Sequence, residues 1–299
     1  MLSPSYLAPS LAAPEAAGFR AAGVFAFHRS SVTGRVSVLF GLEGRSSKNA
    51  FHINVLGGKV DQGESALQTA SREFWEESGT VFAPSSEQVA SRLAQGDVLW
   101  YRDAKYALHF LQLSDAEADI DRRYGEQRAR KAAEAQAGGA AVIDVHSEMD
   151  ELLYIDLYVL LRYLNQQLGL PAQGRHSQCG PVATSVGPRP MINFTAAMLN
   201  CHEVRERMLA WLEATNGEEG RAQAAEIRAG ALSKMNKQRN HTPRKSGPDD
   251  SRANGEQVPA AAAAPSDDPA AQAASAPGVA AAPTSAASAG PSAAGNDRV

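Results

Sequence analysis

The order of apolar and polar residues predicts alternating strands and helices over roughly the first 215 residues. Four short apolar runs are typical of strands: 23–28, 35–41, 51–56 and 105–113. Leu67, Ala70 and Phe74 recur at the spacing of one helix face, and residues 65–78 contain neither Gly nor Pro. We therefore expect a helix over 65–78 with that apolar stripe buried.

Further along the chain, residues 152–155 read as a strand, and the leucines of 156–168 have helical periodicity. A last helix is expected at about 193–214, where apolar residues recur from Phe194 to Leu212. These elements indicate an α/β fold class, and the part from about 18 to 215 is long enough to bury a full core.

The chain changes character beyond Trp211, its last aromatic residue. From Val258 onward it is mainly Ala, Pro, Ser and Gly, which cannot bury enough apolar surface to offset the entropy of ordering. We expect four parts: a flexible leader (1–17), one domain (18–215) with an insertion at about 115–141, a marginal helix or linker (216–239), and a disordered Ala/Pro/Ser-rich tail (240–299).

Charge and composition exclude several classes of protein. A formal net charge of −4 over 299 residues is not typical of a dedicated nucleic-acid binder. Cys179 and Cys201 lack metal-ligand spacing and do not indicate a disulfide-stapled secreted domain. No apolar stretch is long enough to span a membrane, so we expect a cytoplasmic protein without a membrane partner. The Ser- and Ala-rich leader and a basic run near the tail leave organelle or nuclear targeting open.

The candidate chemistry is concentrated in two neighbouring runs, Gly58-Lys-Val-Asp-Gln-Gly-Glu64 and Arg72-Glu73-Phe74-Trp75-Glu76-Glu77-Ser78-Gly79. Three of the four glutamates fall on one arc of about 100° of the predicted helix. Carboxylates this close repel one another unless a cation holds them, and a hard divalent metal with oxygen ligands is the simplest candidate. Such a metal beside a glycine-bearing loop suits chemistry on phosphates. The alternative is a solvated acidic helix face.

The spacing of seven residues argues against that alternative. They match the Nudix box, G-x5-E-x7-R-E-U-x-E-E-x-G-U, where U is a bulky aliphatic residue: Gly58, Glu64, Arg72, Glu73, Glu76, Glu77 and Gly79. The chain therefore resembles the Nudix hydrolase family over Gly58–Thr80, with Thr80 in place of the final aliphatic residue. The resemblance implies an α/β/α sandwich around a mixed β-sheet. It also implies a metal-dependent pyrophosphohydrolase that cleaves a nucleoside diphosphate linked to another moiety, using Mg²⁺ or Mn²⁺.

The resemblance also implies a role for each box residue. The metal ligands would be Glu73, Glu76 and Glu77, with the Gly57 carbonyl as a further ligand and Glu64 in the outer shell or on a second metal. Arg72 is expected to orient Glu76, its i,i+4 neighbour of opposite charge, rather than to touch the substrate.

The general base is not fixed by the box. Glu148 and Glu151 are the first candidates, because in this family the base often lies on a distant loop and both residues precede the strand at 152–155. Glu73 or Glu77 could serve instead. Each of the two distant glutamates could equally be an ordinary surface acid.

Two interpretations stay open for several other segments and residues. The arginine-rich insertion at 115–141 is either an exposed helix or a lid that meets phosphate, and the basic run from Lys234 to Lys245 is either a charged linker or a weak RNA contact. Trp100 and Tyr101 either pack in the core or stack on a nucleobase, and Lys59 either reaches a phosphate or is solvated.

Two hypotheses of function follow. The first is an active hydrolase, with nucleotide sugars, dinucleoside polyphosphates, nucleoside triphosphates, inositol pyrophosphates and capped RNA as candidate substrates. The second is a catalytically silent Nudix-fold module that binds a nucleotide, a protein or RNA. The presence of every box glutamate favours the enzyme, because silent modules tend to lose them.

Overall fold

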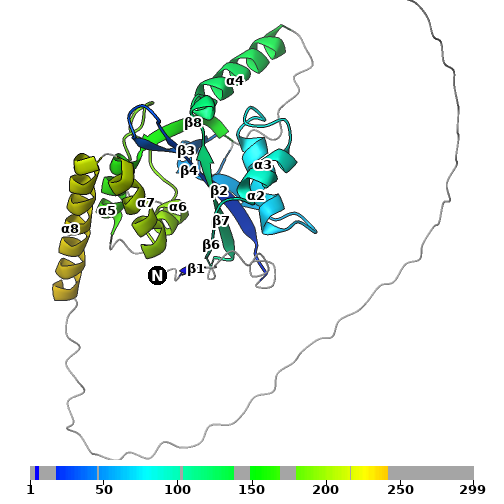
Figure 1. Cartoon of the computed structure of the whole chain (residues 1–299). Helices are drawn as coiled ribbons and strands as arrows, with labels where there is room; N and C mark the ends of the chain where they lie inside the picture. The colour runs from blue at the N-terminus through cyan, green and yellow to red at the C-terminus, as the bar shows by residue number, and fades with distance from the viewer. Residues whose placement is uncertain are drawn as a thin grey trace, which may run out of the picture. The chain divides into compact units, whose positions relative to one another are not determined.

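Strand β2 (Ala21–Arg29) lies at the centre of a mixed sheet (Figure 1). It pairs in parallel with β7 (Tyr106–Leu113) on one side and antiparallel with β3 (Val36–Glu43) and β5 (Leu56–Lys59) on the other. Four further strands complete the eight-stranded sheet of the described residues: β1 (Pro4–Tyr6), β4 (Ile53–Asn54), β6 (Val98–Tyr101) and β8 (Met149–Asp156). β1 and β6 extend the β7 side, and β4 and β8 both pair with β3.

The computed structural model describes residues 4–6, 18–45, 47–101, 104–137, 149–168, 180–215 and 217–241. All of them belong to one compact unit that ends at Arg244. Most of the expected leader and nearly all of the expected tail lie outside the described residues, as does the candidate base Glu148.

The alternation of side chains along β2 divides the core into two layers. Ala22, Val24 and Ala26 belong to the layer that also contains Phe74, whereas Phe25 and Phe27 point into the opposite layer. Because small residues face one layer and phenylalanines the other, one sheet can pack closely against a helix on one side and fill a thicker layer on the other.

Helices cover both faces of the sheet (Figure 1). α2 (Ala66–Glu77) and α3 (Ser86–Leu93) lie on one face. The other face is covered by four helices: α5 (Leu157–Gln167), α6 (Asn193–Leu199), α7 (His202–Thr215) and α8 (Gly217–His241). This is the α/β/α sandwich around a mixed sheet that the sequence predicts. Within the part of the chain that is described, no helix has both the length and the apolar character needed to cross a membrane.

Helix α2 forms where the sequence predicts it, for local reasons. Ser65 and Gln68 make a reciprocal capping box, in which each side chain binds the backbone of the other residue. Ala70 and Phe74 of the apolar stripe are fully buried. At the C-terminal end Gly79 has a φ of +66°, and an added Cβ would lie 2.8 Å from the Tyr124 ring. A glycine is therefore required at this position.

Thr80 has a structural consequence that the box pattern alone does not show. It is exposed and has a φ of +64°, which is rare for a β-branched residue. Val81 and Phe82 pack against the core instead, and Phe82 contacts Phe74 edge-on with ring centroids 5.1 Å apart. The packing contact expected of an aliphatic residue at this box position is thus made by the next two residues.

Several elements differ from the sequence-based prediction. The expected strand at 51–56 is two strands, because β4 pairs with β3 and β5 with β2. The expected helix at 193–214 is broken between α6 and α7, where the Asn200 side chain binds the Leu164 carbonyl and the Arg205 guanidinium. Helix α3 and strand β6 were not predicted, since each is short.

Helix α8 packs on the same core although its sequence is mostly polar. Ala224 and Ile227 are buried, and Asn165 of α5 donates a hydrogen bond of 2.8 Å to the Ile227 carbonyl. Arg228 pairs with Glu206 and Glu213 of α7. The division of the chain into domain, linker and tail stays a prediction, but α8 is a continuous helix with a buried face.

The substitution Ile227→Ala should lower the free energy of unfolding by about 2–4 kcal/mol, because it leaves a cavity between α8 and the core. Leu232→Ala is the matched control, since Leu232 lies on the same helix with 61% of its surface exposed. That control should change stability by less than about 0.5 kcal/mol. Urea unfolding of both variants checks this, and equal effects would show that α8 is not part of the folded core.

Candidate active site

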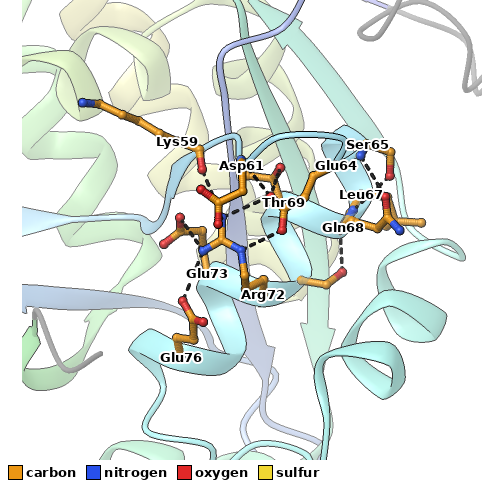
Figure 2. Close-up of polar contacts among 11 residues, drawn as sticks. Lys59, Asp61, Glu64, Ser65, Leu67, Gln68, Thr69, Arg72, Glu73 and Glu76 are labelled. Carbon is orange, nitrogen blue, oxygen red and sulfur yellow. Dashed lines mark hydrogen bonds and ion pairs between the residues drawn. The ribbon is translucent and has the colours of Figure 1, made fainter. Parts of the chain in front are cut away.

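The box carboxylates lie where α2 crosses β5 and the loop that joins them (Figure 2). Gly58 of β5 lies directly below Glu73, and a Cβ added to Gly58 would be 2.4 Å from the Glu73 carboxyl carbon. Any larger residue would push that carboxylate away. The glycine at this box position therefore allows a charged side chain to lie flat against the strand.

Glu77 ties the end of α2 to the same strand. The backbone N–H of Gly57 donates a hydrogen bond of 2.6 Å to its Oε2 atom, and the residue is only 4% exposed. A buried carboxylate is costly unless hydrogen bonds satisfy it. The contact brings the Gly57 backbone and the Glu77 carboxylate together, as expected if both act on one ligand.

Arg72 is the centre of the polar network. Its Nη1 atom donates to Glu73 Oε1 at 2.9 Å and to Glu76 Oε2 at 3.2 Å, and its Nη2 atom donates to the Lys59 carbonyl at 3.1 Å. The predicted i,i+4 pair of Arg72 and Glu76 is thus present, as the longest of the Arg72 hydrogen bonds in a larger cluster. The guanidinium offsets repulsion between neighbouring carboxylates and holds α2 to β5.

Glu64 accepts hydrogen bonds from three residues. It makes a bidentate pair with Arg72, at 2.7 Å to Nε and 3.1 Å to Nη2, and it accepts bonds from Thr69 Oγ1 and the Asp61 N–H. The hydrogen bond from Arg72 is the main reason why the pKa of Glu64 falls to about 2. Both Glu64 oxygens thus accept hydrogen bonds from the protein itself. The role of Glu64 as a metal ligand stays a prediction.

The donors at this site are all oxygen atoms, which is the chemistry that Mg²⁺ or Mn²⁺ prefers. Glu73 and Glu76 are mostly buried, with 16% and 21% of the side chain exposed, so their charges are only partly screened by water. The described residues contain no group of three His, Cys, Asp or Glu side chains already gathered as a metal site. The side chains present are therefore of the kind that binds such an ion. The Arg72 guanidinium lies between the carboxylates of Glu73 and Glu76.

The structure places the two distant base candidates differently. Glu148 lies outside the described residues. Glu151 is exposed on β8 and pairs with Leu42 of β3, whose side chain points into the layer of α5 to α8. Because directly opposed residues of an antiparallel pair share a face, Glu151 lies on the face away from α2. Its assignment as general base stays a prediction.

The other residues considered for the site are buried in the core, exposed away from the carboxylates, or paired with acidic residues. Trp100 and Tyr101 are 2% and 1% exposed, so they pack in the core. The Lys59 side chain is exposed and points away from the carboxylates in Figure 2, although its carbonyl binds Arg72. The arginines of helix α4 (Ile120–Gln136) each face an acid: Arg122 and Arg123 face Asp119, Arg128 faces Asp150, and Arg130 faces Glu134.

Three residues near the box were missed by the sequence analysis. Asp61 and Thr69 hold Glu64, and the spacing of the box gives no sign of either. Tyr106 lies in a strand that the sequence marks only as a strong strand, yet its hydroxyl lies beside Gly57. Contacts between β7 and the box depend on the sheet pairing, which the sequence pattern does not reveal.

Comparison with known families agrees with this geometry. Residues 20–136 match the family model of the NUDIX domain. The match runs from β2 to α4, and the resemblance first seen at Gly58–Thr80 is confirmed. No curated protein sequence matches the chain significantly.

Three solved structures are similar in part. An Ap4A hydrolase from C. elegans, in a binary complex, is 21% identical over 40% of this chain and 98% of its own, with a TM-score of 0.23. A MutT/nudix family protein from Enterococcus faecalis is 11% identical over 76% and 70%, with a TM-score of 0.32. The Nudix hydrolase RenU from M. smegmatis is 15% identical over 39% and 87%, with a TM-score of 0.21. At these values they assign no substrate to this chain.

Because the pKa of Glu64 is lowered from 4.5 to about 2, its ion pair stabilises the fold fully above about pH 4.5 and loses that contribution as the pH falls to 2. The variant Glu64→Gln should therefore be less stable than the wild type by on the order of 1–2 kcal/mol at pH 7. This difference should shrink between pH 4.5 and pH 2. Urea unfolding across that range measures it.

Glu218→Gln at the exposed start of α8 serves as the control for loss of one surface charge. Its stability should follow that of the wild type at every pH. A destabilisation of Glu64→Gln that is the same at pH 2 and pH 7 would contradict the role of the ion pair with Arg72.

Proposed function

We propose that this chain is a metal-dependent pyrophosphohydrolase that cleaves a nucleoside diphosphate linked to another moiety. The observation that supports it most is the meeting of Glu73, Glu76 and Glu77 on one helix with the backbone of Gly57 and Gly58 on the adjacent strand. A Nudix domain with every box glutamate present agrees with an active enzyme.

The cofactor that these residues would hold is Mg²⁺ or Mn²⁺. When bound, the ion would neutralise pyrophosphate oxygens and lower the pKa of a bound water. Glu73, Glu76 and Glu77 would be its carboxylate ligands, together with the Gly57 carbonyl. The Glu77 carboxylate is already oriented by the Gly57 N–H, which donates to its Oε2 atom.

Arg72 has a positioning role in this proposal. It holds Glu73 and Glu76 by one nitrogen and Glu64 by two, so it keeps the carboxylates in place without facing a substrate. Glu73 or Glu77 would accept the proton of the attacking water if the distant glutamates do not. Both residues lie on α2, close to the Gly57 and Gly58 backbone.

The substitution Glu76→Gln should lower Mg²⁺-dependent hydrolysis by at least about 100-fold, because an amide is a poor ligand for a hard cation. The fold should persist, since the Gln carbonyl can still accept from Arg72. A phosphate-release assay over nucleotide sugars, dinucleoside polyphosphates, nucleoside triphosphates, inositol pyrophosphates and capped RNA measures activity. Melting temperature checks the fold.

Glu87→Gln on the exposed side of α3 is the control for this assay and should retain full activity. Unchanged turnover in Glu76→Gln would refute the metal assignment. A wild-type chain that hydrolyses nothing in the panel with either Mg²⁺ or Mn²⁺ would favour a silent Nudix-fold module that binds a nucleotide, a protein or RNA.

The substitution Gly58→Ala tests the position of Glu73 separately. The new Cβ would lie 2.4 Å from the Glu73 carboxylate, and that flexible side chain would move rather than the strand. We expect Mn²⁺ affinity, measured by calorimetry, to fall roughly 10–100-fold, as when a residue that orients a ligand is lost. Stability should change little.

Gly125→Ala on helix α4 is the matched control, because a Cβ there meets nothing within 4 Å. It should leave Mn²⁺ affinity unchanged and raise stability slightly. Equal Mn²⁺ affinity in Gly58→Ala and the wild type would show that Glu73 is not a ligand.

A further inference from the structure

Tyr106, the first residue of β7, reaches the box from the sheet. Its hydroxyl lies in a space left by two glycines that pair across β2 and β5, Gly23 and Gly57. A Cβ on Gly23 would be 2.1 Å from the hydroxyl oxygen, and a Cβ on Gly57 would be 2.8 Å from it. The two positions where β2 and β5 lack side chains are therefore the positions that admit this group.

The Tyr106 hydroxyl makes no hydrogen bond to the other described residues, although the residue as a whole is only 7% exposed. Its oxygen is not one of the fully buried polar atoms that lack a partner. Two other buried tyrosines do bind the protein: Tyr101 donates to the Met198 carbonyl at 2.9 Å, and Tyr124 donates to the Met149 carbonyl at 2.6 Å. The Tyr106 hydroxyl is therefore left to donate to a group that is not part of the described protein.

The surroundings of this hydroxyl are those of the carboxylate cluster. Gly57, beside it, donates its N–H to Glu77. The hydroxyl can therefore donate a hydrogen bond to an oxygen atom that a cation holds near those carboxylates.

The ring of Tyr106 is not available for stacking on a nucleobase. It is packed in the layer of α5 to α8, edge-on to Phe194 of α6, with ring centroids 5.2 Å apart and an interplanar angle of 66°. Only the hydroxyl extends toward the box. Its partner is therefore a small polar group rather than an aromatic one.

We propose that the Tyr106 hydroxyl donates a hydrogen bond to a phosphate oxygen of the substrate bound at the Gly57–Glu77 end of the box. This inference rests on the proposed function, since the phosphate would be held there by the cation. The Tyr106 hydroxyl would then contact the phosphate from β7, whereas the carboxylates would hold the cation from α2. Gly23 and Gly57 leave the space that the hydroxyl occupies.

The test is Tyr106→Phe, which removes one oxygen atom and keeps the ring. The probe is imidodiphosphate, a pyrophosphate analogue that resists hydrolysis, titrated by calorimetry onto the full chain with saturating Mn²⁺. We expect its affinity to fall roughly 10-fold, as for loss of one hydrogen bond to a charged group. Mn²⁺ affinity without the probe should stay within about 2-fold of the wild type.

Tyr101→Phe is the matched control, because Tyr101 is the strand partner of Tyr106 and is equally buried. Its hydroxyl serves Met198 and Cys201, so this variant should be less stable than the wild type and yet bind imidodiphosphate normally. Tyr106→Phe should show the reverse, with melting temperature preserved and binding weakened. A purely structural hydroxyl would not give this reversal.

Two results would overturn the proposal. One is equal imidodiphosphate affinity in Tyr106→Phe and the wild type, and the other is loss of Mn²⁺ binding itself in Tyr106→Phe. Glu76→Gln separates this failure from failure of the proposed function. If Glu76→Gln loses Mn²⁺ and Tyr106→Phe has no effect, only the role of Tyr106 is wrong. If the wild type and Glu76→Gln bind Mn²⁺ equally, or if the wild type binds no imidodiphosphate, both the proposed function and the role of Tyr106 are refuted.

Discussion

The ion pairs of Arg72 are the interaction on which the rest of the site depends. One guanidinium contacts Glu64, Glu73 and Glu76 and also binds the carbonyl of Lys59 on the adjacent strand. Without that charge, three carboxylates within a few ångströms would repel one another and the loop at 60–65 would lose its main tie to α2. The contacts that neutralise the carboxylates are therefore the same contacts that hold α2 against β5.

The second constraint is the closeness of backbone to functional groups at one point of the sheet. Gly58 allows the Glu73 carboxylate to lie on one side of β5, and Gly23 and Gly57 admit the Tyr106 hydroxyl on the other. Two opposed layers of the fold therefore approach the same short strand. A side chain on any of these glycines would separate groups that a bound phosphate and its cation would need together.

Much of the local structure could be predicted from the sequence. The stripe of Leu67, Ala70 and Phe74 and the lack of Gly and Pro located α2, because helix formation depends on short-range spacing. The pair of Arg72 with Glu76 followed from the same geometry. The break before α7 was not predictable, because the Asn200 side chain is bound by groups on α5 and α7 that lie far from it in sequence or in the next turn.

The sequence by itself determined the class of chemistry proposed for this chain, because the identity and spacing of the box residues place carboxylates along one face of one helix. The tertiary structure alone decided what surrounds that face. Pairing of β7 with β2 brings Tyr106 near Gly57, and the register of β8 directs Glu151 away from α2. Spacing along a helix follows from backbone geometry alone, whereas sheet order and register result from packing of the whole chain, which no single segment encodes.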